Sequence, residues 1–244
     1  MMRLVCERNG RSMRISGLQK MTLLDYPGLV ACTVFTGGCN FRCPFCHNAA
    51  LVLPERARSG ESAEDVLRFL ASRRGLLDGV VISGGEPLLQ PELTDFLRRV
   101  RAMGYRIKLD TNGSFPERLR ALVEEGLVDR VAMDIKNSPD LYAATAGLRL
   151  LDIAAVERSK SYLLEGSIPY EFRTTVVRGL HTAESLADAA RWIAGAREYY
   201  LQQYRNSGDI LAPNGLGAFP DDEMRALLTT VQAIVPAAQL RGVE

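Results

Sequence analysis

The sequence predicts an α/β fold in which a parallel sheet with outer helices forms an open, partial (β/α)6 barrel. Six short apolar runs, rich in β-branched or aromatic residues, have the composition of strands buried on both faces. Helical patterns separate these runs, and this alternation favours right-handed crossovers and parallel strands. Six units are too few for a closed eight-stranded barrel. The runs are 29–36, 79–83, 105–110, 128–134, 172–177 and 198–203.

Helix signals lie between the predicted strands. Ser62 and Asp65 resemble a capping box at the start of a periodic apolar segment, which Gly75 can end. Pro91 suits the first position of the next helix, and Gly104 can end it. Periodic segments followed by glycine also predict helices over 116–125, 151–165 and 182–194, and a last helix starts near residue 221.

Charge and hydropathy limit the expected partners and location. The 244 residues include 30 Lys and Arg against 29 Asp and Glu, a net charge of +1. This balance creates no field that would attract nucleic acid or an anionic membrane, so we expect neither partner. No apolar run reaches the roughly 18 residues of a membrane span, and the N-terminus lacks the apolar core of a signal peptide. We therefore expect a cytoplasmic protein.

The chain is expected to have three parts. Residues 1–12 form a loose N-terminal extension, because a regular apolar–polar alternation begins only at Met13. Residues 13–205 form the partial barrel and carry a cysteine loop at 37–48. Residues 206–244 begin with an exposed loop rich in proline and glycine and continue as a helix.

The cysteines are confined to the N-terminal part of the chain, whereas a disulfide framework would spread them along it. Cys39, Cys43 and Cys46 have the spacing C-x3-C-x2-C, so one short loop can bring three thiolates to a compact centre. Structural zinc usually takes four ligands, and the nearest fourth candidates are His47, beside Cys46, and Cys32, inside a predicted strand. A cubic iron–sulfur cluster with one open iron fits three thiolates. A zinc site and a redox thiol motif are the alternatives.

Polar segments follow four consecutive predicted strands. They are the cysteine loop at 37–48 and the segments at 84–87, 110–113 and 134–136. Because the carboxyl ends of parallel strands lie at the same edge of a sheet, these segments are expected to converge on one rim. The sequence therefore predicts a functional site at that rim.

Two of these segments resemble the motifs of a known family. Cys39, Cys43 and Cys46, with the aromatic Phe45 before the last cysteine, are followed by Gly-Gly-Glu-Pro at 84–87. In this order the motifs resemble those of radical S-adenosylmethionine (SAM) enzymes, over about residues 13–205. The resemblance implies a barrel of the radical SAM type and a [4Fe–4S] cluster on the three cysteines, with an open iron that chelates SAM. It further implies reductive cleavage of SAM to methionine and a hydrogen-abstracting 5′-deoxyadenosyl radical.

The resemblance also implies contacts with SAM at these two segments. Phe45 and the backbone near His47 would flank the adenine. Gly84, Gly85 and Glu86 would hold the methionine amino group, since glycine permits close approach of the backbone. The alternative for Glu86 is a residue that merely terminates a strand.

A third set of residues would complete the site by the same resemblance. Asp134 and Lys136 are placed for the ribose or carboxylate of SAM, and Arg173 for the carboxylate. Some activating enzymes of the family hold a monovalent cation nearby, and Asp110, Thr111 and Asp134 match its oxygen ligands. The alternatives are an ordinary turn at Asp110 and Thr111, a solvated Lys136, and ion pairs between Arg173 and neighbouring carboxylates.

Segments 17–20 and 24–28 resemble the N-terminal signature of glycyl-radical-enzyme activases, and among these the anaerobic ribonucleoside-triphosphate reductase activating proteins. This resemblance implies that Asp25 contacts the glycine-bearing loop of a partner enzyme. The alternative is an aspartate that caps the turn before Pro27. Some activators end the sixth strand in Pro-Tyr-His, whereas this chain has Gln-Tyr-Arg at 203–205, which leaves the ribose contact and the substrate open.

The resemblances together imply an enzyme that removes a Cα hydrogen from one glycine of a glycyl radical enzyme, with a reducing donor such as flavodoxin or ferredoxin. No cysteine follows Cys46, so we expect one cluster and no auxiliary cluster. A small-molecule radical SAM enzyme of the 7-carboxy-7-deazaguanine synthase type is the alternative function. A non-enzymatic iron- or zinc-binding interaction module is a third class.

Overall fold

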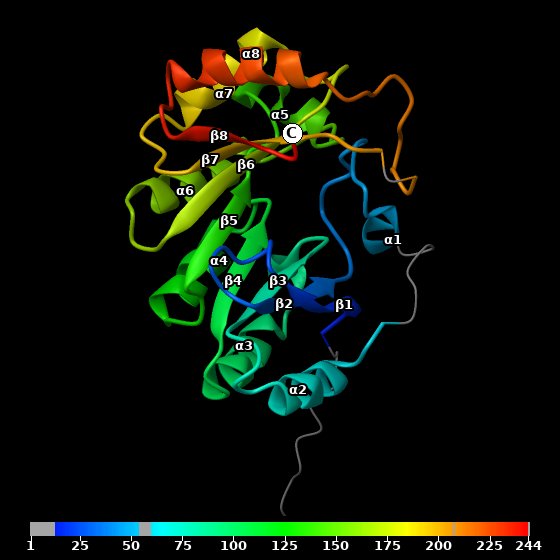
Figure 1. Ribbon diagram of the computed structural model, residues 1–244, viewed down its shortest axis with the longest axis vertical. Coiled ribbons are helices and arrows are strands. Elements are labelled where there is room, and N and C mark those ends of the chain that lie inside the picture. Colours follow the sequence, from blue (N-terminus) through cyan, green and yellow to red (C-terminus); the bar gives the residue numbers. More distant parts are fainter. Residues whose placement is uncertain (1–12, 54–59, 207, 244) are drawn as a thin grey trace, which may run out of the picture.

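The computed structural model describes residues 13–53, 60–206 and 208–243. Its strands form one eight-stranded sheet whose spatial order follows the order in the sequence (Figure 1). The edges of the sheet are its first strand, in dark blue, and its last, in red. The strands are β1 (Ile15–Thr22), β2 (Ala31–Thr36), β3 (Gly79–Gly84), β4 (Arg106–Thr111), β5 (Arg130–Asp134), β6 (Tyr170–Val176), β7 (Tyr199–Gln203) and β8 (Ala238–Arg241).

Strand pairing confirms the predicted open α/β class. β1 is antiparallel to β2, and every neighbouring pair from β2 to β8 is parallel. The six predicted runs correspond to β2 through β7. The edge strands β1 and β8 lie outside the predicted set, because β1 is half exposed with an irregular register and β8 has only four residues. Neither therefore shows the continuous apolar run of a strand buried on both faces.

Helices connect the parallel strands. None of those in the described ranges is long and apolar enough to cross a membrane. They are α1 (Ala49–Val52), α2 (Ala63–Ser72), the 3-10 helix η2 (Pro87–Leu89), α3 (Leu93–Ala102), α4 (Pro116–Glu124), α5 (Pro139–Thr145), α6 (Ile153–Leu164), α7 (Ala183–Trp192) and α8 (Asp221–Gln232).

The helix starts follow the expected signals with one exception. Ser62 caps α2 and forms the predicted capping box with Asp65. The predicted start at Pro91 is wrong, because α3 begins at Leu93. The side chain of Gln90 donates a hydrogen bond to the carbonyl of Gly37 at 2.7 Å, and the following proline lies in a turn between η2 and α3. The proline thus belongs to this turn and precedes the helix.

The C-terminal part of the chain extends the sheet. The predicted loop and helix are followed by β8, which pairs in parallel with β7. α8 buries Met224, Leu227 and Val231 and lies beside α7 and β8 (Figure 1). The residues after 206 thus contribute a strand to the same sheet, and the predicted division of the chain stays a prediction. The predicted extension at 1–12 lies outside the described residues.

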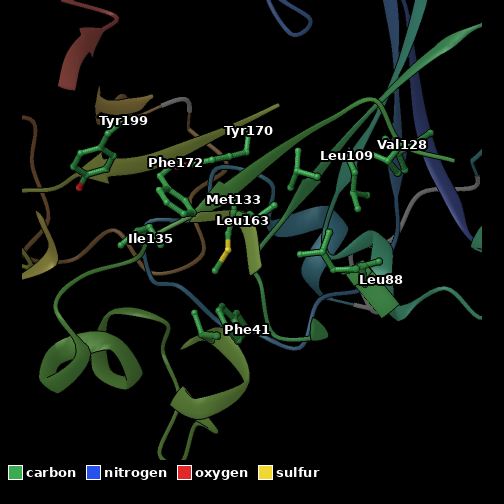
Figure 2. Close-up of a cluster of buried hydrophobic side chains, with 14 of the residues drawn as sticks. Phe41, Leu88, Leu109, Val128, Met133, Ile135, Leu163, Tyr170, Phe172 and Tyr199 are labelled. Carbon is green, nitrogen blue, oxygen red and sulfur yellow. The ribbon is translucent and has the colours of Figure 1, made fainter. Parts of the chain in front are cut away.

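One large hydrophobic core anchors the cysteine loop. Figure 2 shows Met133 of β5 near Phe172 of β6, and both side chains are fully buried. Phe41 of the cysteine loop belongs to the same core and is 2% exposed. Full burial of such a side chain contributes about 1.5–3 kcal/mol, so the loop is fixed to the core between its first two cysteines. Cys32 of β2 is also buried there, as its position in a strand predicts.

Candidate active site

The loops after β2, β3, β4 and β5 meet at one rim of the sheet, around two adjoining cavities. The smaller cavity, of about 70 Å³, is lined by Cys39 and Cys43. The larger cavity, of about 330 Å³, extends from Asp25, between β1 and β2, to Gln202 on β7. The predicted convergence of polar segments is therefore present. The residues that line both cavities are Ser83, Gly84, Asp110, Asp134 and Arg173.

Backbone hydrogen bonds fix the cysteine loop at its second half. The amide of Arg42 donates to the carbonyl of Ala146 at 2.9 Å, and the amide of Cys46 donates to the carbonyl of Cys43 at 3.0 Å. Burial raises the pKa of Cys39 to about 12 and that of Cys43 to about 11. The free thiols are therefore protonated at neutral pH and would release protons when iron binds.

The chemistry of the three cysteines can be compared with the needs of a cluster and of a single ion. Within the described ranges, no three His, Cys, Asp or Glu side chains are close enough to hold one metal ion. A tetrahedral zinc ion needs such convergence, whereas in a cubic cluster each cysteine binds a different iron atom. Cys39, Cys43 and Cys46 are free thiols on one loop and fit the second arrangement. Cys32, the possible fourth zinc ligand, is buried in the core.

Phe45 and His47 lie beside the end of β7. Both line a third cavity, of about 230 Å³, together with Gln202 and Tyr204. Phe45 is buried, and the ammonium group of Lys136 lies 5.9 Å from the centre of its ring. The structure thus places an apolar ring next to the cavity, where a flat heterocycle could pack.

Two glycines bring the β3 turn against the cysteine loop. A Cβ atom on Gly85 would lie 1.9 Å from the carbonyl oxygen of Gly38, and Gly84 has a φ of +120°. The amide of Glu86 donates to that same Gly38 carbonyl at 2.9 Å. The close approach that glycine permits here is therefore to the neighbouring loop, while Gly84 and Gly85 also line the smaller cavity.

The side chain of Glu86 connects the turn after β3 with the loop after β4, so its role is larger than terminating a strand. Its carboxylate is fully buried and accepts hydrogen bonds from the amide of Leu88 at 3.0 Å, the hydroxyl of Thr111 at 2.9 Å and the amide of Asn112 at 2.7 Å. Burial raises its pKa to about 7 against the effect of these donors. Glu86 thereby fixes the loop after β4, and its expected contact with SAM stays a prediction.

Four charged side chains form a network at the cavity. Arg173 donates to Asp134 at 3.0 Å and to Asp110 at 3.2 Å, and Lys136 donates to Asp134 at 2.9 Å. Burial alone would raise the pKa of Asp134, but Lys136 and Arg173 hold it well below its usual range. The side chains of Lys136 and Arg173 are each 14% exposed. Lys136 is therefore mostly buried, and its solvated alternative does not apply. Arg173 forms ion pairs with neighbouring carboxylates, as its alternative interpretation expects.

The expected cation ligands have protein partners in the structure. The guanidinium of Arg173 already bridges Asp110 and Asp134, and the hydroxyl of Thr111 points to Glu86. An arginine thus supplies positive charge between the two carboxylates, and the expected monovalent cation stays a prediction.

Asp25 lies at the far end of the larger cavity. Its carboxylate accepts a hydrogen bond from the hydroxyl of Thr33 at 2.6 Å, and its carbonyl accepts one from the ammonium group of Lys108 at 2.8 Å. The carboxylate is thus bound to β2 and faces the cavity rather than capping the turn before Pro27. The adjacent Leu24 is 88% exposed.

Three polar residues of the site were not among the predicted ones. Asn112 hydrogen-bonds to Asn40, and both hydrogen-bond to Ser114, next to Cys39. Asn112 lies in a segment that the sequence marks as a turn tip, but no spacing rule connects it to a residue 72 positions earlier. Only the proximity of the β2 and β4 loops reveals the contact.

Comparisons with known proteins agree on one family. The sequence profile of the radical SAM superfamily matches residues 33–196. A protein of Methanocaldococcus jannaschii assigned as a glycyl-radical enzyme activating enzyme is 31% identical over 199 residues, which cover 78% of this chain and 79% of that protein. The pyruvate formate-lyase-activating enzyme of Clostridium pasteurianum is 35% identical over 133 residues, but these cover only 52% of this chain and 54% of that enzyme.

A relative with a small-molecule activity also matches. The 7-carboxy-7-deazaguanine synthase of Methanopyrus kandleri is 32% identical over 169 residues, which cover 59% of this chain and 66% of that enzyme. This match covers less of both sequences than the match to the M. jannaschii protein.

Solved structures share the fold at low sequence identity. A domain of a pyruvate-formate lyase-activating enzyme from Bacteroides vulgatus has a TM-score of 0.55 and 18% identity, with 67% of this chain and 99% of that domain covered. SuiB of Streptococcus suis, bound to its precursor peptide SuiA, has a TM-score of 0.67 and 15% identity, with 84% of this chain and 47% of SuiB covered. Such likeness establishes the architecture alone.

Proposed function

The chain belongs to the radical SAM superfamily, and from this membership we propose that it activates a glycyl radical enzyme by removing a Cα hydrogen from one glycine of that partner. As a member of the superfamily it is a radical SAM enzyme that uses a [4Fe–4S] cluster and SAM. Its similarity to glycyl-radical enzyme activating enzymes places it with that kind of enzyme at the level of the family.

The observation that carries the proposal is the shape of the larger cavity. It extends from the charged residues at the rim to Asp25, a polar passage of about 330 Å³. Next to Asp25, the large apolar side chains Met21, Leu23 and Leu24 are 63%, 64% and 88% exposed. Exposed apolar groups beside a polar cavity are typical of a site that receives another protein. A glycine-bearing loop would enter along this surface.

The residues of the chain have proposed roles in this reaction. Cys39, Cys43 and Cys46 would hold the cluster, since three free thiols on one loop match its ligand chemistry. When bound, the cluster supplies the electron for reductive cleavage of SAM, from which the hydrogen-abstracting species arises. The cationic groups of Lys136 and Arg173 line the adjoining cavity and would bind the carboxylate of SAM.

Further residues would orient SAM and the substrate. Gly84 and Gly85 line the smaller cavity and would leave space for the methionine moiety, with Glu86 fixing the turn. The ring of Phe45, buried beside the third cavity, would pack against the adenine. Asp25 would bind the backbone of the glycine-bearing loop. Each of these roles orders a flexible ligand close to the position of hydrogen transfer.

We propose anaerobic ribonucleoside-triphosphate reductase as the partner and a flavodoxin or ferredoxin as the electron donor. The support is the similarity of segments 17–20 and 24–28 to the activating proteins of that reductase. The location we propose is the cytoplasm, because free thiols that bind a cluster persist in a reducing compartment. An enzyme of the 7-carboxy-7-deazaguanine synthase type is the second candidate, supported by the relative from M. kandleri.

The proposal is tested with anaerobically reconstituted enzyme, reduced with dithionite and mixed with SAM and the reductase of the same genome. We expect a glycyl doublet in electron paramagnetic resonance (EPR) spectra, together with 5′-deoxyadenosine. Cys43→Ala should abolish both products. Asp25→Asn should lower the doublet about tenfold or more, since a hydrogen bond to a charged group is worth about 1.5–3 kcal/mol. It should leave partner-free cleavage of SAM unchanged.

A matched control is Asp188→Asn, because Asp188 is exposed on α7 and forms an ion pair with Arg191 of the same helix, away from the cavities. This variant should give a normal doublet. A reductase that stays free of radical while a pterin substrate is consumed would favour the second candidate. Absence of 5′-deoxyadenosine from the wild-type protein would refute both enzymatic functions.

A further inference from the structure

The side-chain amide of Asn112 lies between the loop after β4 and the first cysteine of the cysteine loop. Asn112 is 4% exposed. Its Nδ2 atom donates to Oδ1 of Asn40 at 2.9 Å and lies 4.0 Å from Sγ of Cys39. The two hydrogens of one amide nitrogen therefore serve the neighbouring asparagine and the cysteine sulfur.

Ser114 determines which way this amide points. The amide and the hydroxyl of Ser114 donate to Oδ1 of Asn112 at 3.0 and 2.5 Å. The Nδ2 atom of Asn40 donates to the hydroxyl of Ser114 at 2.9 Å and closes a ring of three side chains. Because two donors face the oxygen of Asn112, its nitrogen must face Cys39 and Asn40. A flipped amide would lose the hydrogen bonds to the backbone amide of Ser114 and to Asn40.

The backbone around this ring is fixed as well. The amide of Asn112 donates to the carboxylate of Glu86 at 2.7 Å, so the residue cannot move away from the cysteine loop without losing a charge-assisted hydrogen bond. The backbone amide of Phe41 lies 3.4 Å from the sulfur of Cys39 and donates to it. Cys39 therefore has two N–H donors directed at its sulfur, one from its own loop and one from the loop after β4.

Donors near a cluster cysteine act on the reduction potential. Reduction adds one negative charge to the cluster, part of which resides on the cysteine sulfurs. An N–H group directed at a sulfur stabilises the reduced state more than the oxidised state, so it raises the potential. Removing the donor makes the cluster harder to reduce.

We propose that Asn112, held by Asn40 and Ser114, is a positioning residue that donates a hydrogen bond to the Cys39 thiolate and raises the reduction potential of the cluster. This inference rests on the cluster ligands of the proposed function, but not on the identity of the substrate. The change in oxidation state is a one-electron reduction by an external low-potential donor. The ring makes the cluster easier for that donor to reduce.

The test is an EPR-monitored redox titration of reconstituted holoenzyme, without SAM or partner, alongside iron and sulfide analysis. At the midpoint potential of the wild type, Asn112→Ala should lower the ratio of reduced to oxidised cluster about tenfold, or about 59 mV for a one-electron couple. Asn112→Asp, with nearly the same shape, should lower it further, because it replaces the donor with a negative charge. Ser114→Ala should give a smaller shift in the same direction, since it frees the amide to rotate.

The matched control is Gln239→Ala, which removes an amide from the exposed edge strand β8 and should leave the potential unchanged. A fully loaded Asn112→Ala with the wild-type potential overturns the inference. If that variant binds too little iron for a titration, the midpoint potential of loaded Asn112→Asp or Ser114→Ala is measured instead. A wild-type potential in that variant likewise overturns the inference. A wild-type chain that binds no [4Fe–4S] cluster refutes the proposed function as well, whereas an unmoved potential in loaded variants refutes this inference alone.

Discussion

His181 is one of the buried polar residues that hold the rim together without facing a cavity. Its Nδ1 atom accepts a hydrogen bond from the amide of Val177 at 3.1 Å, and its Nε2 atom then donates to the carbonyl of Lys136 at 2.8 Å. The ring is 3% exposed. Burial lowers the pKa of His181 below the usual 6.5. A neutral histidine therefore fixes the backbone from which Lys136 projects.

This arrangement predicts a specific dependence of stability on pH. The unfolded chain takes up a proton at residue 181 as the pH falls below about 6.5, whereas the folded chain resists it, so the stability from this group is present above pH 6.5 and is lost at lower pH. His181→Gln should cost about 1–3 kcal/mol at pH 8, because it leaves a buried group unpaired. Its unfolding free energy, measured in urea, should change less between pH 8 and 5.5 than that of the wild type. Parallel pH profiles would contradict the prediction.

Residues of the site differ in how far the sequence predicts them. Cys39, Cys43 and Cys46 are recognisable from their spacing, since three thiols within one short loop must lie close together. Asn40 and Ser114 have no such signal, because their hydrogen bond joins positions 74 apart in the chain. The spacing rules of turns and helices do not reach that far.

At the scale of elements, the turn after β3 and the cysteine loop after β2 form one unit. The amide of Gly85 donates to the carbonyl of Thr36 at 2.9 Å, and the next amide reaches the carbonyl of Gly38. Parallel pairing of β2 with β3, from Ala31 opposite Gly79 to Thr36 opposite Gly84, brings these loops together. The two motifs of the family are therefore in physical contact.

Gly85→Ala tests this contact. The added Cβ would lie 1.9 Å from the carbonyl oxygen of Gly38, a backbone atom, so the backbone of one of the two loops must shift. We expect a loss of about 1–3 kcal/mol, as for overpacked interiors, and less than half of the wild-type iron content after reconstitution. Gly217→Ala is the matched control, because its Cβ would meet nothing closer than 3.9 Å. Unchanged iron content and melting temperature in Gly85→Ala would show that the loops are not coupled.

At the scale of the whole molecule, Glu171 connects strands that are not neighbours in the sheet. Its side chain, on β6, lies 3.4 Å from the ammonium group of Lys108 on β4 and 3.2 Å from the guanidinium of Arg241 on β8. In a flat sheet β4 and β8 would lie about 19 Å apart, at about 4.8 Å for each step between strands. One buried carboxylate on β6 therefore connects β4, on one side of it, with β8, on the other.

Glu171→Gln tests the importance of this network. Burial alone would raise the pKa of Glu171, but Arg241, Lys108 and Arg173 lower it to about 2. Its stabilisation is thus present above pH 4.5 and is lost as the pH falls toward 2. At pH 7 the variant should lose about 3–5 kcal/mol, the cost of leaving buried charges without a partner.

Urea unfolding at pH 7 and below pH 4.5 measures this effect. The difference between the wild type and Glu171→Gln should shrink in acid, because protonation removes the same charge from the wild type. Glu198→Gln is the control: its side chain is 37% exposed and pairs with Arg130 at the edge of the network. It should cost less than about 1 kcal/mol. Equal losses in both variants would mean that the buried position of Glu171 has no special effect.

The sequence by itself determined the fold class, the six central strands and the three cysteines, because apolar periodicity and short spacings are properties of neighbouring residues. The tertiary structure decided that β1 and β8 extend the sheet, that Arg173 lies between Asp110 and Asp134, and that Asn112 faces Cys39. Such contacts depend on strand order, register and curvature, which bring together side chains that are far apart in the chain. The pattern of neighbouring residues thus determines the strands and helices, and the packing of these elements determines which polar groups meet.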